Sequence, residues 1–159
     1  MKRMIVAVLA IALALLCACA PATPAEQPKS LSLSYRGVEL TVGAAADGVI
    51  SALGSDYTMT EADSCAGQGV DRMYTYPSVR LYVFVSAEGK AVISSVSYTD
   101  DGAQTADGLR IGSSAEQVIA ALGEADETSD ARLIYRGEGS VLTFGLRDSV
   151  VVSVVLSEE

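Results

Sequence analysis

The sequence predicts an α+β domain formed by tandem duplication: each unit is one helix followed by three antiparallel strands, with the helices packed on one face of the sheet. Three observations lead to this prediction. Residues 42–54 recur as residues 111–123, with the same two glycines, Val-Ile pair and leucine. Residues 92–101 match residues 150–159 in character. Apolar residues at strand-like spacing follow each helical segment, so the duplication extends over whole units.

The two units extend over about residues 37–101 and 106–159, and each begins with a helix. In the second unit a serine at 113 or 114, with Glu116 or Gln117 three residues later, predicts a capping box. Val118, Ile119 and Leu122 are expected on one helical face, and Gly123 at the left-handed end. In the first unit, alanines replace the capping serines and Gly48 weakens the interior, so this helix is expected to be the less stable one.

The strands follow from alternating side chains and from turn residues between them. We expect three strands in each unit and one leading strand around Leu31, Leu33 and Tyr35. The expected unit strands are 72–76, 79–86, 91–99, 132–136, 140–146 and 150–157.

The first residues resemble the signal of a bacterial lipoprotein. Lys2 and Arg3 precede an apolar run that is too short to span a bilayer, which is typical of a secretion signal. Leu16-Cys17-Ala18-Cys19 resembles a lipobox, with a small residue before the cysteine that receives the lipid. Cleavage before Cys17 and ordinary secretion are the alternatives. We therefore expect a signal peptide at 1–18, diacylation of Cys19, a Pro-rich tether at 19–30 and a single domain at 31–159.

Composition excludes several classes of function. Without Lys2 and Arg3, 9 basic and 20 acidic residues remain, so the mature chain carries a net charge of −11 and does not attract nucleic acid. Histidine is absent, which removes the usual general base and the commonest zinc ligand. Cys65 is the only thiol left after acylation, so no internal disulfide is expected. We expect no enzyme, no cofactor and no metal.

The helix motif resembles that of small envelope lipoproteins of the SmpA/OmlA type; here it is Ile111-Gly112-x-Ser114-x-x-Gln117-Val118-x-x-x-Leu122-Gly123. That group includes the secreted beta-lactamase inhibitor protein, itself a tandem repeat. The segment 63–72, followed by Tyr74-Thr75-Tyr76, is similar to two-repeat lipoproteins of Firmicutes. The resemblance implies the fold predicted above. It carries little about function, because the same architecture serves in assembly factors and in inhibitors.

Aromatic residues gather in the first unit and mark a candidate protein-binding surface at Tyr74, Tyr76, Tyr82 and Phe84. The first pair shares one strand face and the second pair another, so an exposed aromatic surface is one interpretation. The alternative is that both strand faces are buried.

A candidate functional loop contains Cys65, Gly67 and Gly69, within an insertion of about eight residues that the second unit lacks. The alternatives are a neutral surface loop, or Cys65 packed as a small hydrophobe. Asp100, Asp101 and Asp107 form an acidic connector, which is a solvated linker or an incidental cation site.

The sequence thus predicts an extracytoplasmic lipoprotein, held at the cell membrane by lipid, that binds or scaffolds a protein partner without catalysis. An inhibitor of an extracellular enzyme is the alternative, and a thiol-redox protein is a further one.

Overall fold

The computed structural model describes residues 30–65 and 68–159. The expected signal peptide, Cys19, the tether up to residue 29 and Gly67 lie outside the described residues. Within the described ranges, no helix is long and apolar enough to cross a membrane.

The described part of the chain forms ten strands and two helices. In chain order they are β1 (Leu33–Tyr35), β2 (Val38–Leu40), α1 (Ala46–Leu53), β3 (Thr58–Asp63), β4 (Gly69–Thr75), β5 (Val79–Ser86), β6 (Ala91–Tyr98), α2 (Ala115–Leu122), β7 (Glu127–Ser129), β8 (Arg132–Gly137), β9 (Ser140–Arg147) and β10 (Val150–Glu158).

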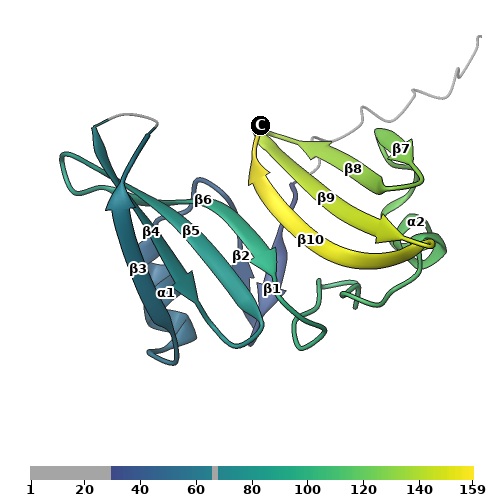
Figure 1. Cartoon of the computed structure of the whole chain (residues 1–159), viewed down its shortest axis with the longest axis horizontal. Coiled ribbons are helices and arrows are strands. Elements are labelled where there is room, and N and C mark those ends of the chain that lie inside the picture. The colour runs from purple at the N-terminus through teal and green to yellow at the C-terminus, as the bar shows by residue number, and fades with distance from the viewer. Residues whose placement is uncertain (1–29, 66–67) are drawn as a thin grey trace, which may run out of the picture.

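Eight of these strands form one antiparallel sheet in the order β3-β4-β5-β6-β10-β9-β8-β7, and β1 pairs with β2 in a separate hairpin. The order is mirrored about the β6–β10 pair, which is joined by only three residue pairs, from Val155↔Ser97 to Ser157↔Ser95. Figure 1 shows α1 and the β1–β2 hairpin behind the first four strands and α2 behind the last four. One face of the large sheet is therefore covered, and we call the other its open face.

The predicted fold class was wrong. The chain is mostly β, with two helices of eight residues each, and four strands rather than three follow each helix. The missed strands are β2, β3 and β7. Of these, β3 and β7 form the two edges of the large sheet and are exposed along their whole length. An edge strand with two solvent-facing sides carries no apolar alternation, so the pattern that predicts buried strands does not detect it.

The ends of the helices follow the predicted signals. The Ser114 side chain accepts a hydrogen bond from the Gln117 N–H, and the Gln117 side chain accepts one from the Ser114 N–H, which confirms the capping box. Ala45 begins α1 without a side-chain cap. Val118 is buried as predicted, but Ile119 is 38% exposed, so the helical face that packs on the sheet is narrower than expected.

The core lies between the sheet and the elements behind it. Tyr76 and Tyr135 are each 1% exposed, and their hydroxyls donate to the carbonyls of Gly54 and Gly123, at 3.3 and 3.0 Å. Both glycines end a helix with a positive φ. The same hydrogen bond, from a tyrosine hydroxyl to a glycine carbonyl, therefore ties each helix end to the sheet. Burial raises the pKa of Tyr76 to about 12, so its hydroxyl stays protonated and can donate this bond.

Candidate functional site

The candidate site is a groove on the open face of strands β3 to β6. Residues that face each other across these strands form a continuous row, since Thr60 pairs with Met73, Met73 with Tyr82, and Tyr82 with Ser95. The groove has a volume of about 610 Å³. Its lining is Thr60, Glu61, Ala62, Asp71, Arg72, Met73, Tyr82, Val83, Ser94 and Ser95.

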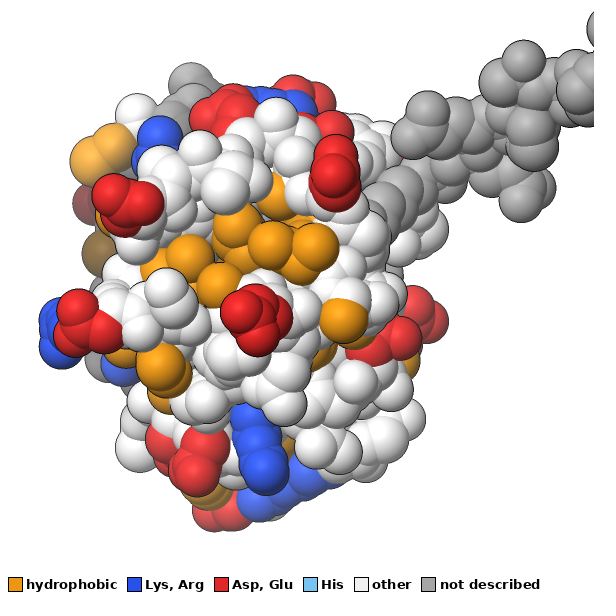
Figure 2. Space-filling view, turned by 90° about the vertical axis from the view of Figure 1, so that its right-hand side faces the viewer, with side chains coloured by type: hydrophobic (Ala, Val, Ile, Leu, Met, Phe, Trp, Pro, Cys, Tyr) orange, Lys and Arg blue, Asp and Glu red, His pale blue; other side chains and the backbone are white. Residues whose placement is uncertain are grey.

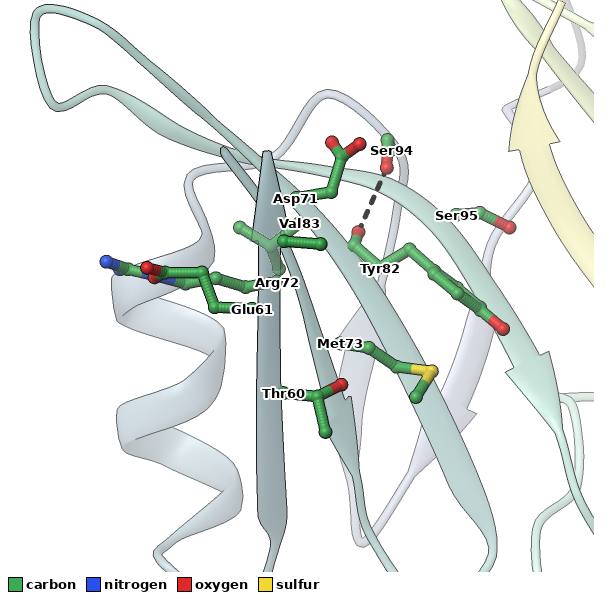
Figure 3. A pocket seen from close by; sticks show the side chains of 10 residues that line it. Thr60, Glu61, Asp71, Arg72, Met73, Tyr82, Val83, Ser94 and Ser95 are labelled. Atoms are coloured by element: carbon green, nitrogen blue, oxygen red, sulfur yellow. Dashed lines mark hydrogen bonds and ion pairs between the residues drawn. The ribbon is translucent and has the colours of Figure 1, made fainter. Parts of the chain in front are cut away.

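Strand alternation determines which side chains face the groove. On β5, Leu81 and Val83 are buried toward the helices, whereas Tyr82 between them is 37% exposed on the open face. Figure 3 shows Tyr82, Met73 and Thr60 on one side of the strands, and Glu61 with Arg72 on the opposite side, toward α1. The Ser94 hydroxyl donates to the backbone carbonyl of Tyr82 at 3.2 Å, at the irregular pairing between β5 and β6.

The four aromatic residues singled out from the sequence do not form one surface. Tyr74 and Tyr76 are buried on the covered face, where their rings lie 5.0 and 5.3 Å from the ring of Tyr57. Tyr82 and Phe84 lie on the open face, with Phe84 half-buried. The prediction of an exposed aromatic surface is therefore wrong for the first pair, and only the second pair remains available to a partner.

The candidate loop residues Gly69 and Cys65 lie in different parts of the structure. Gly69 is the first residue of β4 rather than a loop residue, and a Cβ there would lie 2.9 Å from Cε2 of Phe84 and collide with the backbone carbonyl of Val85. Glycine at 69 thus allows the Phe84 ring to lie close to β4. Cys65 is a free, exposed thiol in the connection between β3 and β4. It is not packed as a small hydrophobe, and it does not line the groove.

Charged groups differ between the two faces near the groove. On the covered side, Arg72 Nε donates to a Glu61 carboxylate oxygen at 2.7 Å, and this hydrogen bond raises the pKa of Arg72. On the open face, Asp71 is exposed and has no ion-pair partner among the described residues. The groove therefore presents an uncompensated carboxylate beside the apolar side chains of Met73 and Tyr82.

The residues missed from the sequence are Met73 and the polar residues near Tyr82: Thr60, Asp71, Ser94 and Ser95. A usable signal was present. Tyr76 N–H bonds to the Val79 carbonyl across the two-residue turn at Pro77 and Ser78, which places odd-numbered residues of β4 opposite even-numbered residues of β5. A two-residue turn thus puts Met73, and not Tyr74, on the face of Tyr82.

The opposite end of the molecule is aliphatic rather than aromatic. Figure 2 shows the side where β7, β8 and α2 lie in Figure 1, with an apolar patch bordered by polar and acidic side chains. The large apolar side chains most exposed in this half of the chain are Ile119, Val150 and Val152, at 38, 40 and 41%. They come from a helix and from the start of β10, so they do not extend the groove.

Among the residues that the structure describes, no group of three or more Cys, Asp or Glu side chains is arranged to hold a metal ion. Comparisons of the chain with protein-family models, with curated proteins and with solved structures found no match. The geometry of the groove is therefore the basis for any functional conclusion.

Proposed function

We propose that this protein is a membrane-anchored, extracytoplasmic lipoprotein that binds a protein partner through the open face of β3 to β6, without catalysis. Lipid on Cys19 holds the chain at the membrane, and the acidic domain beyond the tether makes the contact. The observation that carries the proposal is the exposed Tyr82 ring beside Met73, in a groove of about 610 Å³ that no described element covers. Aromatic and methionine side chains in such a setting are typical of protein contact sites.

Chemistry supports binding over catalysis. The chain contains no histidine, and the groove combines hydroxyl groups and apolar groups with one carboxylate on its open side. Nucleophilic catalysis requires a base beside the nucleophile, and the serines here have backbone carbonyls as partners: Ser94 bonds to Tyr82 and Ser95 to Leu156. These hydroxyls act as donors that fix the strands.

Site-specific photo-crosslinking tests the binding surface. A benzoylphenylalanine placed at position 82 in the full chain, in intact cells, is expected to trap a partner as a discrete adduct. Position 119 on α2 is the matched control, since Ile119 is 38% exposed and Tyr82 37%, on opposite sides of the sheet. An adduct from position 82 alone supports the open face. Equal adducts from both positions, or an adduct from position 119 alone, would contradict it.

Two further measurements complete this test. Tyr82→Ala is expected to reduce recovery of the same partner from detergent-solubilised membranes, and identification of that partner shows whether it is an extracellular enzyme. A mass spectrum of the mature N-terminus tests the anchor. It should show a diacylated Cys19, and an unmodified chain beginning at Ala20 would end the lipoprotein proposal.

A further inference from the structure

Two side chains of opposite charge stand on the open face without an ion-pair partner in the described part of the chain. Asp71 is exposed on β4, and Arg80 is half-buried on β5. The Nε atom of Arg80 is buried and has no hydrogen-bond partner among the described residues. A buried guanidinium nitrogen without a partner calls for an explanation, above all in a chain with 20 acidic residues.

Of the six other arginines among the described residues, three have acidic partners, whereas Arg110, Arg132 and Arg147 have none. Arg36 pairs with Asp56 at 3.0 Å, Arg72 with Glu61 at 2.7 Å, and Arg136 with Glu127 and Glu159. None of these four ion pairs is made by a residue of the stripe Asp71, Met73, Tyr82 and Arg80. The charges of the stripe therefore remain available to a ligand.

The register of β4 and β5 sets the distance between the two charges. Asp71 lies opposite Phe84, Met73 opposite Tyr82, and Thr75 opposite Arg80. Asp71 and Arg80 therefore stand at the two ends of a stripe whose middle is Met73 and Tyr82. Four residue steps along a strand, at about 3.3 Å each, separate the ends by about 13 Å.

We propose that this stripe binds an extended peptide segment of the partner that carries a cationic and an anionic side chain four residues apart, with an apolar side chain midway. Residues i, i+2 and i+4 of an extended segment point to the same side and span the same distance of about 13 Å. The cation would meet Asp71, the apolar side chain would pack on Met73 and Tyr82, and the carboxylate would meet Arg80. This inference rests on the proposed function and names the chemistry of its ligand.

Charge complementarity favours such a segment over a second copy of this chain. The mature chain would carry a net charge of −11, so two copies repel each other. A purely basic ligand would be attracted to the domain as a whole but would place a cation against Arg80. A segment with both charges satisfies each end of the stripe, and its carboxylate gains from the partly desolvated guanidinium.

The test uses the full-length lipoprotein in non-ionic detergent micelles and fluorescein-labelled peptides followed by anisotropy. The mixed-charge probes contain Lys-Thr-Leu-Thr-Glu or the reverse order, between serine pairs, and the like-charge probes contain lysine or glutamate at both ends. At least one mixed-charge peptide is expected to bind about fivefold more tightly than either like-charge peptide. The better of the two orders then gives the direction of the bound chain.

Charge reversal should change the preference in a defined way. Asp71→Lys is expected to favour the peptide with two glutamates, and Arg80→Glu the peptide with two lysines. Asp101→Lys and Arg110→Glu are the matched controls, because both are exposed residues of the connector between β6 and α2, and they should leave the ranking unchanged. If Arg80→Glu does not fold by circular dichroism, Arg80→Gln serves instead and should abolish the preference over the two-lysine peptide.

The proposal is overturned if the two-lysine peptide binds best, if no peptide binds, if the control variants change the ranking as much, or if the protein dimerises through this face in ultracentrifugation. A crosslink from position 82 with no peptide preference would remove the proposed ligand chemistry and leave the binding function standing. If neither the crosslink from position 82 nor a peptide preference is observed, the proposed function and the proposed ligand chemistry both fail.

Discussion

Replacing Tyr98 with phenylalanine is expected to weaken the attachment of the β1–β2 hairpin to the large sheet. The Tyr98 hydroxyl donates a hydrogen bond to the Ser34 carbonyl at 3.0 Å and accepts one from the Ser34 N–H at 3.2 Å. The tyrosine is 4% exposed, so water does not readily replace its hydroxyl. Leaving a buried polar group without a partner costs about 1–3 kcal/mol, and we expect a decrease of that size in the free energy of unfolding at pH 7.

The same residue predicts how stability depends on pH. Burial raises the pKa of Tyr98 from 10.0 to about 12. The folded state therefore holds the Tyr98 proton more tightly than the unfolded state. The stability that arises from this difference in pKa is complete below pH 10 and is lost as the pH rises through 12. The full loss corresponds to about 2.7 kcal/mol, and about half of it is gone at pH 11. Between pH 9 and 11, Tyr98→Phe should lose roughly 1 kcal/mol less stability than the parent chain.

Urea unfolding followed by circular dichroism at pH 7, 9 and 11 measures both effects. Tyr82→Phe is the control, because its hydroxyl has no hydrogen bond to the described residues and its ring is 37% exposed. This control should stay within about 0.5 kcal/mol of the parent chain, as expected for a surface change. If Tyr98→Phe also stays within that margin at pH 7 and follows the same pH dependence, the reasoning from burial and hydrogen bonding is refuted.

Three further predictions concern local structure. Ser114→Ala removes the capping box of α2 and should lower the free energy of unfolding by about 1 kcal/mol, whereas Ala45→Ser, at the uncapped start of α1, should raise it by a similar amount; no difference between the two in urea unfolding would contradict the role of the caps. Gly69→Ala forces a Cβ into the neighbouring strand and should destabilise by about 1–3 kcal/mol, while Gly48→Ala, in open space within α1, should stabilise by about 0.5–1 kcal/mol. Opposite signs in thermal melts confirm this pair, and equal signs refute it. Cys65 is exposed and should react with maleimide in the native protein at nearly the rate seen in urea; strong protection would show that the connection between β3 and β4 is covered.

Much of the backbone could be predicted because the signals were local. The six strands predicted for the two units lie within a few residues of their predicted ranges, and the glycines at 54 and 123 end both helices. The fold class was nevertheless wrong, since it depended on elements without such a signal. The polar edge strand Thr58–Asp63 is held by pairing with β4, which is a property of the sheet and not of its own sequence.

The site was harder to predict because it depends on which strand face is covered. Tyr74, Tyr76, Tyr82 and Phe84 are equally aromatic. Alternation alone places Tyr74 with Tyr76 and Tyr82 with Phe84, but it does not relate one pair to the other. The turn between β4 and β5 sets the relation between the strands, and the position of α1 decides which face is buried. Asp71 and Arg80 carry no sequence signal of their own, since an isolated charge in a strand is usually just solvated.

A comparison between the two halves of the sheet separates what the fold needs from what the groove adds. The segments before the helices bond to Ile93 in one half and to Val151 in the other, so these positions correspond. Following the strand pairs outward from them places Gly145 where the first half has Tyr82, and Thr143 where it has Arg80.

Buried positions keep their character under the same correspondence, with Leu81 matched by Phe144 and Tyr76 by Tyr135. The second half therefore builds the same helix-covered face with Gly145 and Thr143 at the positions of Tyr82 and Arg80. Since folding does not require these two side chains at this register, their presence in the first half is better explained by a contact that the fold itself does not supply.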